Sequence, residues 1–446
     1  MNEEKYVAAI EISSSKIVAI VGKIRPDGQL EIIASEQEKG YDSVRYGIIQ
    51  NLEETSSRIS RIISILERKP VVAPRKISGL FVGISGRSLR SIPTKVSLNL
   101  PDDSEITDEI IYRLKALALN TAIDSSLEII DAVPRSFIID KNETLSPKGM
   151  VGNSISAEFD LVVCRPEIKR NITRTIVDKL NINTCGFVVT PLAVGDLILS
   201  AEQKRLGCML VDMGGETTTI TIYKNGHLVY FATLPLGGRH ITRDITTLNV
   251  LEERAEEIKI TSGNAIPREM ASSINYNGVR DTDVSNLIVA RSEEIVVNII
   301  KQIKYADLKD SDLPGGIILI GGASKLNGMF DLIAKKSALP VSRGALPHNI
   351  HFEDFKTNTS DTIEVASVLY EGAVKFPNAL CLEHPQPEVP ITGTTTNTEP
   401  EEIIHKPIED PKPKDPSWFE KIIKKTSDGI SEFFGGKEDD SDPLND

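Results

Sequence analysis

LVDMGGETTTITIY, residues Leu210–Tyr223, is the stretch of this 446-residue sequence from which the fold can be inferred. An apolar run leads to Asp212, the pair Gly214 and Gly215 follows, and Thr217–Tyr223 alternates threonine with isoleucine as a strand does. The pattern predicts a β-hairpin with glycines at its tip. Glycines let backbone N–H groups approach an anion and adopt positive φ, and a carboxylate before the turn can hold a cation through water. For this motif alone, an ordinary glycine hairpin is the alternative.

Two further stretches have related patterns. Tyr6–Val21, YVAAIEISSSKIVAIV, is again strand, polar turn and strand, with Glu11 at the head of the turn. In Gly315–Leu326, GGIILIGGASKL, a buried strand is followed by a glycine pair and then by an expected helix. In other folds this strand–glycine–helix arrangement binds nucleotides. The two acid-headed hairpins lie about 200 residues apart. They predict two halves of one fold that face a phosphate chain from opposite sides.

The order of these three stretches resembles the actin-like ATPase superfamily, and the finer detail resembles the FtsA family of bacterial cell-division proteins. The resemblance covers Met1 to about Phe376 and the extreme end of the chain. It implies an α/β fold that is actin-like and two-lobed (a duplicated ribonuclease-H-like fold), with an α+β inserted subdomain and a C-terminal amphipathic helix. The phrases that carry the FtsA resemblance are KIVAIVGKIRPDG at Lys16–Gly28, DAVPRSFII at Asp131–Ile139, LPLGGRHITRDI at Leu234–Ile245 and AEEIKI at Ala255–Ile260.

Composition points to a soluble cytoplasmic protein. The formal net charge of −13 argues against a nucleic-acid binder, because such domains usually carry a basic patch. The first apolar run carries Glu11 and is read as a strand, not a signal sequence, and no apolar run reaches the roughly 18 residues that a bilayer span requires. The four cysteines show no paired spacing and are expected to be reduced packing residues: Cys164, Cys185, Cys208 and Cys381.

The resemblance implies that the chain divides into two lobes and an insert, and periodicity places the helices and strands within them. We expect a first lobe at 1–85 and 159–200, an inserted subdomain of the family's 1C type at 86–158, and a second lobe at 201–377 with a small subdomain at about 236–310. The resemblance implies that the insert contacts other protomers and other division proteins. Helices are expected at 52–67, 108–119, 167–180, 192–199, 239–248, 251–260, 285–305 and 364–374, and short strands of the insert at 94–98, 127–130 and 135–139.

The resemblance also assigns roles in binding ATP and Mg²⁺. Asp212 and Glu11 would hold the metal. Glu257 and Lys259 would reach the adenosine ribose and base, although a solvated helix face with ion pairs is the alternative for these two. The remaining candidates for nucleotide contact are Ser14, Ser15, Lys16, Gly214, Gly215, Thr217, Thr218, Gly237, Gly238, Gly321, Gly322 and Lys325.

Departures from the superfamily pattern bear on hydrolysis. Ser13 stands where a glycine is usual, and a Cβ at positive φ would strain the backbone by about 1–2 kcal/mol. Glu216 also replaces a glycine, and its carboxylate would repel phosphates unless it turns outward or meets a cation. Thr190 occupies the position that often positions the attacking water, but a hydroxyl is neither a carboxylate base nor an amide. We expect at most a slow ATPase, in which the nucleotide is a ligand for assembly.

The last part of the sequence has a different composition. Residues 378–416 are rich in proline, threonine and acid and are expected to be a disordered linker. Residues 417–434 predict an amphipathic membrane-targeting helix with lysines opposite its apolar face, although docking on the protein itself or on a partner is the alternative. Residues 435–446 form an acidic tail that anionic lipid would repel. The expected membrane-facing residues are Trp418, Phe419, Ile422, Ile423, Ile430, Phe433 and Phe434.

The FtsA resemblance implies a peripheral protein on the cytoplasmic face of the cell membrane at the division site. There it would self-assemble into filaments and tether FtsZ filaments to an anionic membrane surface, with the FtsZ contact on roughly Leu236–Asp310. Several weakly binding helices on one polymer would attach together, which makes the tether firm. The alternatives are another actin-like scaffold of the pilus-assembly type and a sugar-kinase-like or chaperone-like ATPase, although no catalytic Asp of a kinase can be placed.

Overall fold

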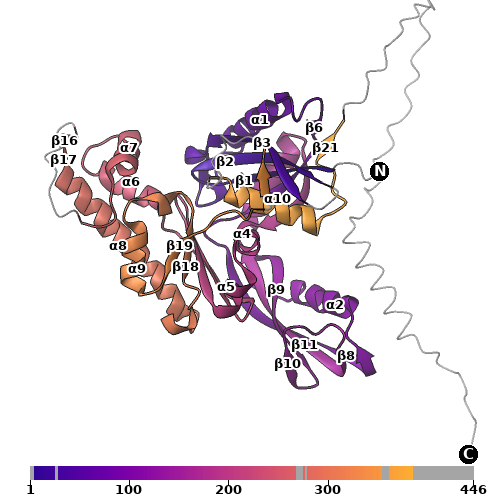
Figure 1. Ribbon diagram of the computed structural model, residues 1–446. Helices are drawn as coiled ribbons and strands as arrows, with labels where there is room; N and C mark the ends of the chain where they lie inside the picture. Colours follow the sequence, from indigo (N-terminus) through magenta and orange to yellow (C-terminus); the bar gives the residue numbers. More distant parts are fainter. Residues whose placement is uncertain are drawn as a thin grey trace, which may run out of the picture. The chain divides into compact units, whose positions relative to one another are not determined.

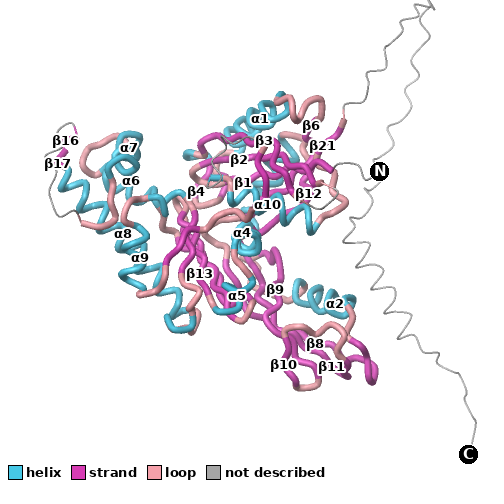
Figure 2. The backbone as a smooth tube through the Cα atoms, viewed as in Figure 1, coloured by secondary structure: helices cyan, strands magenta, loops and turns pink. Residues whose placement is uncertain are grey.

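The computed structural model describes residues 5–25, 29–267, 275–276, 279–348, 350–353 and 361–384 (Figures 1 and 2). These ranges all fall within one compact unit, Met1–Gln386. The disordered linker expected at 378–416 was placed too early, because residues up to His384 are described, Cys381 is buried and Leu382–Glu383 forms a strand. The remainder of that linker, the amphipathic helix at 417–434 with all its membrane-facing residues, and the acidic tail at 435–446 lie outside the described residues.

The first half of the fold is built on a six-stranded sheet in the order β12-β7-β1-β2-β3-β20. The first three strands along the chain form an antiparallel meander, while β7 runs parallel to β1 and β12 parallel to β7. Every residue of β7 is buried, so both faces of the sheet must be covered. The strand bounds are β1 Lys5–Ile12, β2 Lys16–Ile24, β3 Leu30–Lys39, β7 Gly79–Ile84, β12 Asn183–Val189 and β20 Ile350–Phe352.

Helices cover the two faces of this sheet. The helix α1 (Leu52–Arg68) begins where the Asn51 side chain accepts a hydrogen bond from Glu54 N at 3.0 Å, and its predicted apolar face is buried. The helix α10 (Ile363–Lys375) packs on β1 and on α4 (Thr190–Ile198) (Figure 1). The assignment of α10 to the second lobe was wrong, because its buried apolar residues belong to the core of the first sheet. The expected helix at 167–180 is α3 (Pro166–Thr173) followed by a π-helical turn at Arg174–Lys179.

The second half repeats the topology of the first. The strands β13, β14 and β15 form an antiparallel meander, and β18 and β19 add parallel strands beside β13. The order β19-β18-β13-β14-β15 therefore matches β12-β7-β1-β2-β3, which is the duplication that the sequence predicts. These strands are β13 Cys208–Met213, β14 Thr218–Lys224, β15 His227–Leu234, β18 Ile317–Ile320 and β19 Val341–Arg343.

The insert has its own hydrophobic core but shares a sheet with the second half. Its strands extend the sheet in the order β10-β9-β11-β8-β15, and the junction pairs Ala232 of β15 with Arg90 of β8. The strands expected at 127–130 and 135–139 are one strand, because Pro134 lies at a register shift opposite Phe159 and does not end the pairing. The expected strand 94–98 is the middle of a longer one. The bounds are β8 Arg90–Glu105, α2 Asp108–Leu119, β9 Glu128–Ile139, β10 Asn142–Thr144 and β11 Val151–Cys164.

Helices pack on the second sheet around a core separate from the first (Figure 1). The step after β18 differs from expectation: a 3₁₀ turn at Gly322–Lys325 precedes α9, because Gly321 and Gly328 have φ of 84° and 75° and interrupt the helix. The helices are α5 Ala201–Leu206, α6 Gly238–Thr246, α7 Glu252–Ser262, α8 Asp281–Tyr305 and α9 Met329–Ser337.

Candidate functional site

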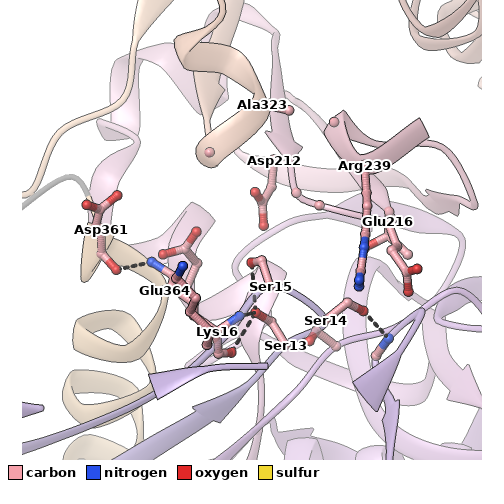
Figure 3. Close-up of a pocket in the computed structure, with 18 of the residues that line it drawn as sticks. Ser13, Ser14, Ser15, Lys16, Asp212, Glu216, Arg239, Ala323, Asp361 and Glu364 are labelled. Atoms are coloured by element: carbon pink, nitrogen blue, oxygen red, sulfur yellow. Dashed lines mark hydrogen bonds between the residues drawn. The ribbon is translucent and has the colours of Figure 1, made fainter. Parts of the chain in front are cut away.

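A cleft of about 910 Å³ lies between the two hairpin turns. The turn between β1 and β2 lines one side and the turn between β13 and β14 lines the other. In Figure 3 the Asp212 side chain points from the second hairpin towards Ser15 of the first. The turns come so close that a Cβ on Gly215 would lie 3.3 Å from the Ser15 Cβ. The prediction that the two acid-headed hairpins face each other is confirmed.

The first turn is held by its own serine. The Ser13 hydroxyl donates to the Lys16 carbonyl at 2.9 Å, and the Lys16 N–H donates back to Ser13 Oγ at 3.3 Å. Ser13 does not have a positive φ, so the strain expected there was wrong: a serine hydrogen bond closes the turn without left-handed backbone. Within the described residues, the N–H groups of Ser14 and Ser15 have no hydrogen-bond acceptor and are free to bind an anion.

The second turn also leaves donors free. Its only backbone hydrogen bond across the loop runs from Gly214 N to Thr217 O at 2.9 Å, among the described residues. The N–H groups of Gly215, Glu216 and Thr217 have no acceptor in the described ranges. Neither glycine adopts positive φ, so these glycines serve close approach and not turn geometry. Each of the two turns therefore presents backbone N–H groups to the cleft.

Glu11 is buried behind the first turn and held by two hydroxyl groups. Ser85 Oγ donates to Glu11 Oε1 at 2.8 Å and Thr190 Oγ1 donates to Oε2 at 2.7 Å. Burial raises the pKa of Glu11 to about 7, with the Glu364 charge acting in the same direction and the two hydroxyls opposing it. The strand β7 makes room for this carboxylate, because a Cβ on Gly83 would overlap Glu11 Oε2.

This arrangement limits the role expected for Thr190. Its side chain is 2% exposed, and its hydroxyl proton is committed to Glu11. Only the lone pairs of Thr190 Oγ1 are left for a water molecule, so the residue can accept a hydrogen bond but cannot act as a base. Thr190 therefore positions Glu11 in this structure.

Asp212 occupies the equivalent place in the second half, without the hydroxyl partners. A Cβ on Gly321 of the neighbouring chain segment would overlap Asp212 Oδ1, just as a Cβ on Gly83 would overlap Glu11 Oε2. Burial raises the pKa of Asp212 well above its usual range, and the nearby charges of Glu364 and Glu11 raise it further. Three carboxylates thus face the cleft, and Glu364 Oε2 is buried without a hydrogen-bond partner among the described residues.

The carboxylates of Glu11, Asp212 and Glu364 suit a cation that would be held partly through water and not by direct bonds to all three. No group of three His, Cys, Asp or Glu side chains in the described residues is arranged to chelate a metal. A cation in the cleft would nevertheless relieve the repulsion among Glu11, Asp212 and Glu364 and give the unpartnered Glu364 oxygen a partner. This donor set fits Mg²⁺, which keeps several waters and is bound by few carboxylates together with phosphates.

Glu216 does not face the cleft as a bare charge. Its carboxylate is fully buried between Arg45 Nε at 2.7 Å and Arg243 Nη2 at 2.6 Å, and it accepts the Tyr46 N–H at 2.7 Å. Burial alone would raise the pKa of Glu216, but the Tyr46 N–H and the two guanidinium groups outweigh it and lower that pKa. Of the two outcomes expected for Glu216, meeting a cation is the one observed. Because Arg45 and Tyr46 follow β3 and Arg243 lies in α6, Glu216 joins the two halves.

The far end of the cleft is formed by α6 and α7. Lys259 Nζ donates to Glu256 Oε2 at 2.7 Å, to Thr242 Oγ1 at 3.0 Å and to Gly238 O at 3.2 Å. Burial lowers the pKa of Lys259, although the Glu256 charge opposes the change. The structure does not bring Glu257 into the lining: it pairs with Arg254 at 2.6 Å on the exposed face of α7, and Glu256 takes its place.

The other predicted residues divide into lining and supporting positions. Lys16 and Lys325 both line the cleft and both contact Asp361: Lys16 contacts its carbonyl and Lys325 its carboxylate. Lys16 and Asp361 are labelled in Figure 3. Supporting positions lie behind the surface: Thr218 donates to Leu236 O at 2.8 Å, and a Cβ on Gly237 would come within 2.6 Å of the Gly214 and Gly215 carbonyls. The predicted residues that line the cleft are Glu11, Ser14, Ser15, Lys16, Thr190, Asp212, Gly214, Gly215, Thr217, Gly238, Lys259, Gly322 and Lys325.

Several cleft residues escaped the sequence interpretation. Glu364 is expected only as the first residue of the helix at 364–374, and nothing in that pattern indicates that it lies beside the cleft. Arg239 pairs with Glu252 of its own half at 2.9 Å. It also pairs with Asp42 of the first half at 3.3 Å. The role of Gly83 beside Glu11 could not be inferred from the sequence, because a single glycine in an apolar strand is common. Arg243, in the segment RHITR after the glycine pair, could have suggested one of the two partners of Glu216.

Comparison with known proteins gives a consistent result. The family model described as "Cell division protein FtsA" matches residues 209–366, and the one described as "SHS2 domain inserted in FTSA" matches residues 86–163. A cell division protein FtsA from Bacillus subtilis is 30% identical over 345 residues, which cover 74% of this chain and 77% of that protein. Its counterpart from Porphyromonas gingivalis is 29% identical over 338 residues, covering 74% of this chain and 70% of that protein.

A solved structure supports the fold class. The chain resembles a component of a "PilM-PilN type IV pilus biogenesis complex" with a TM-score of 0.59 at 14% identity, over 83% of this chain and 98% of that chain. This likeness bears on the fold alone. Together with the duplicated sheets and the matched insert, it confirms the predicted actin-like α/β fold with an inserted subdomain. On the identity to the relatives and the family matches, the chain belongs to the FtsA family of cell division proteins.

Proposed function

We propose that the cleft binds ATP together with Mg²⁺. The observation that carries this proposal is the pair of facing turns, each with backbone N–H groups that have no acceptor in the described ranges. Such N–H groups bind phosphate oxygens, and a cleft of about 910 Å³ is of the size that holds a nucleotide. In this assignment Ser14, Ser15 and Gly215 contact the phosphates.

The charged residues of the cleft complement a metal–phosphate group. Lys16 and Lys325 supply positive charge for the phosphates, and both lie on the side of the cleft next to Asp361. Asp212 and Glu11, with Glu364 beside them, would hold the magnesium ion through water. When bound, the ion would neutralise phosphate charge. The two halves would then be tied together by one ligand.

The adenosine is assigned to the far end of the cleft. Lys259 and Glu256 form a charged pair on its wall, and Thr242 and Gly238 complete the polar lining. This Lys–Glu pair, with Glu256 43% exposed, offers both a donor and an acceptor to a ribose or a purine edge. Glu257 reaches the adenosine only if α7 rotates from its present orientation.

Hydrolysis in this site is expected to be slow at most. The hydroxyl proton of Thr190 is occupied by Glu11, and Glu11 itself accepts two hydroxyl hydrogen bonds behind the turn. Neither group is placed as a free base for water. The nucleotide therefore acts as a ligand that stabilises the closed arrangement of the halves and prepares the chain for assembly.

Binding of ATP can be measured by isothermal titration calorimetry with ATP in magnesium and in EDTA. We expect saturable binding at one site that weakens without the metal. Replacing Gly215 by Val, which would place a branched side chain against Ser15, should abolish binding. Replacing Ala201 by Val, at the exposed first residue of α5, is the matched surface control. Equal affinity of the two variants would refute the assignment.

We further propose that the chain tethers FtsZ filaments to the cytoplasmic face of the cell membrane at the division site, and that it self-assembles there. The support is membership of the FtsA family together with the sequence pattern at 417–434, which places aromatic and aliphatic residues opposite lysines. Among the described helices, none is long and apolar enough to span a bilayer. Several weak interfacial helices on one filament would attach cooperatively.

The division of labour between the parts follows from the same proposal. The small subdomain at about 236–310 would contact FtsZ, and the insert at 86–158 would contact other protomers and division proteins. The part of the tail beyond His384, up to residue 416, would supply the reach between the nucleotide-binding body and the membrane. The acidic residues 435–446 would weaken attachment to anionic lipid.

Vesicle flotation tests the membrane part. The full chain should float with vesicles containing anionic lipid, and Trp418→Glu with Phe419→Glu should remain in the soluble fraction. Tyr112→Glu, a substitution of an exposed aromatic residue on α2, is the matched control and should float normally. Co-sedimentation of the full chain with FtsZ filaments tests the partner. Flotation that is unaffected by the two tail substitutions would refute the membrane assignment.

A further inference from the structure

Two of the four cysteines meet at the edge of the first sheet. Cys185 lies in β12, and Cys381 lies directly before β21 (Leu382–Glu383), which pairs with β6 (Lys76–Ile77). Their Sγ atoms are 3.6 Å apart, and the Cys381 thiol donates to Cys185 Sγ. This pair could not be inferred from the sequence, because 196 positions separate the two cysteines and only the fold brings them together.

The surrounding backbone brings these two thiols together. A Cβ on Gly79 in β7 would overlap Cys185 Sγ, so the thiol occupies the space that the glycine leaves. The Cys381 carbonyl accepts the N–H groups of Ser78 and Gly79, both at 3.0 Å. The Cys185 thiol also donates to the Leu380 carbonyl at 3.4 Å. The same short segment of β7 therefore fixes both cysteines.

Cys185 differs from the other three cysteines in reactivity, because the pKa of each of the other three is raised. The hydrogen bond from Cys381 lowers the pKa of Cys185, and the Lys5 charge acts in the same direction against burial. Burial raises the pKa of Cys164 and of Cys208 to about 12. Cys185 is half-buried and Cys381 is fully buried, so an oxidant in solution reaches Cys185 first.

We propose that Cys185 and Cys381 are a modification site that closes to a reversible disulfide when the chain meets a hydroperoxide. The Cys185 thiolate attacks a peroxide oxygen, the O–O bond breaks, and the product is a sulfenic acid with hydroxide, or the parent alcohol, as leaving group. The Cys381 sulfur then attacks the Cys185 sulfur, the S–O bond breaks, and its thiol proton and the oxygen leave as water. The two thiols supply two electrons, which reduce the peroxide. A dithiol reductant reverses the bond by exchange.

Closing this bond requires a small movement. The Sγ atoms must approach from 3.6 Å to about 2.05 Å, which side-chain rotation can supply. The disulfide would join β12 to the segment that carries β21, and this segment also pairs with β6. The last described residues, up to His384, would then be covalently fixed to the first sheet. Oxidation would therefore fix the position of the end of the described body relative to the first sheet.

The test is a peptide map of the full chain after treatment with hydrogen peroxide and quenching of free thiols. We expect a linked pair of peptides containing Cys185 and Cys381, a chain mass lower by two hydrogen atoms, and recovery of both thiols with dithiothreitol. Hydrogen exchange of the backbone at 377–383 should slow on oxidation and recover on reduction. In the reduced chain, iodoacetamide should label Cys185 before the other three cysteines.

Matched variants decide between this pair and general oxidation. Cys185→Ser and Cys381→Ser should each abolish the linked peptides, whereas Cys164→Ser and Cys208→Ser should retain them. Circular dichroism of the four variants shows whether each one folds. Oxidation of Cys185 to sulfinic acid without linkage in the folded chain would overturn the proposal, as would a disulfide that joins two chains.

Discussion

The two hairpin turns of the cleft are equivalent in topology but differ in how their acids are held. Glu11 accepts two hydroxyl hydrogen bonds and lies behind its turn, whereas no described residue donates a hydrogen bond to Asp212. Both acids lie against a glycine of the neighbouring parallel strand or its end, Gly83 in one half and Gly321 in the other. The duplicated fold thus keeps the space for each acid and changes only its hydrogen bonding.

This difference suggests a division of roles between the halves. An acid that is already satisfied by Ser85 and Thr190 contributes mainly to the structure and to the charge of the cleft. An acid without donors is the better partner for a hydrated cation, because nothing else competes for its oxygen atoms. We therefore propose that, in the metal-bound state, Asp212 would make the stronger contact and Glu11 the weaker one.

The largest expected effect concerns the pH dependence of stability. The pKa of Glu11 is raised from 4.5 to about 7 in the folded chain, so folding favours the protonated form. The contribution of Glu11 is fully present below about pH 4.5 and is lost as the pH rises through about 7, by on the order of 3 kcal/mol. Glu11→Gln should remove this loss. Urea denaturation of the nucleotide-free chain, at pH values between these limits and above, measures it.

The control for Glu11→Gln is the same substitution at Glu257, an exposed residue of α7. Its stability curve should run parallel to that of the unmodified chain at every pH. If Glu11→Gln also ran parallel, Glu11 would be solvated like Glu257, and the contrast with Asp212 would be lost.

The next effect concerns the metal. Asp212→Asn should lower the affinity for ATP in magnesium by about 10–100-fold, as loss of a carboxylate that acts through metal-bound water does. Affinity for ATP in EDTA should change little. Asp196→Asn, at an exposed residue of α4 that pairs with Lys204, is the matched control. An equal loss with and without magnesium would place Asp212 on the nucleotide and not on the metal.

A third prediction tests the contact through which the second turn reaches the first half. Glu216→Gln leaves Arg45 and Arg243 without their shared carboxylate, and the free energy of unfolding should fall by about 1.5–3 kcal/mol. Asp42→Asn, whose side chain is 79% exposed and which pairs with Arg239, should cost less than about 1 kcal/mol. Urea denaturation of both variants gives the comparison, and equal losses would mean that the buried Glu216 contact adds no stability beyond a surface pair.

The smallest expected effect distinguishes neighbouring residues of α7. Glu256→Gln should weaken ATP binding by about 3–10-fold, because it removes the charged partner of Lys259 in the cleft. Glu257→Gln should stay within about twofold, because its side chain is 58% exposed and pairs with Arg254. Calorimetry in magnesium measures both. The reverse order would restore the role that the family resemblance implies for Glu257.

Local pattern predicted the parts of the site that depend on one hairpin. The acids, the serine and glycine turns and their order along the chain are visible in short stretches such as Leu210–Tyr223. Gly83 was not predicted, because its importance appears only when β7 lies beside β1. Glu256 was missed by one position, since a step of about 100° around a helix moves a side chain from the cleft to solvent.

Long-range pairing limited the prediction of the fold in the same way. The helix α10 was recognised from its period, but only its packing on β1 assigns it to the first half. The partners of Glu216 come from two halves, and no local pattern joins Arg45 to Arg243. The insert was predicted as a separate module from its pattern of short strands and one helix. Its own core agrees with that, while its membership of the second sheet could not be inferred.

The junction between Ala232 and Arg90 has a mechanical consequence. The insert follows the first half along the chain, yet its strands continue the sheet of the second half. If the halves separate to release a ligand, either the insert swings with the second sheet or the backbone pairing at Ala232 breaks. The position of the insert relative to the first sheet would therefore change with the opening of the cleft. The distance between fluorophores on α1 and α2 would report that opening during a cycle of nucleotide exchange.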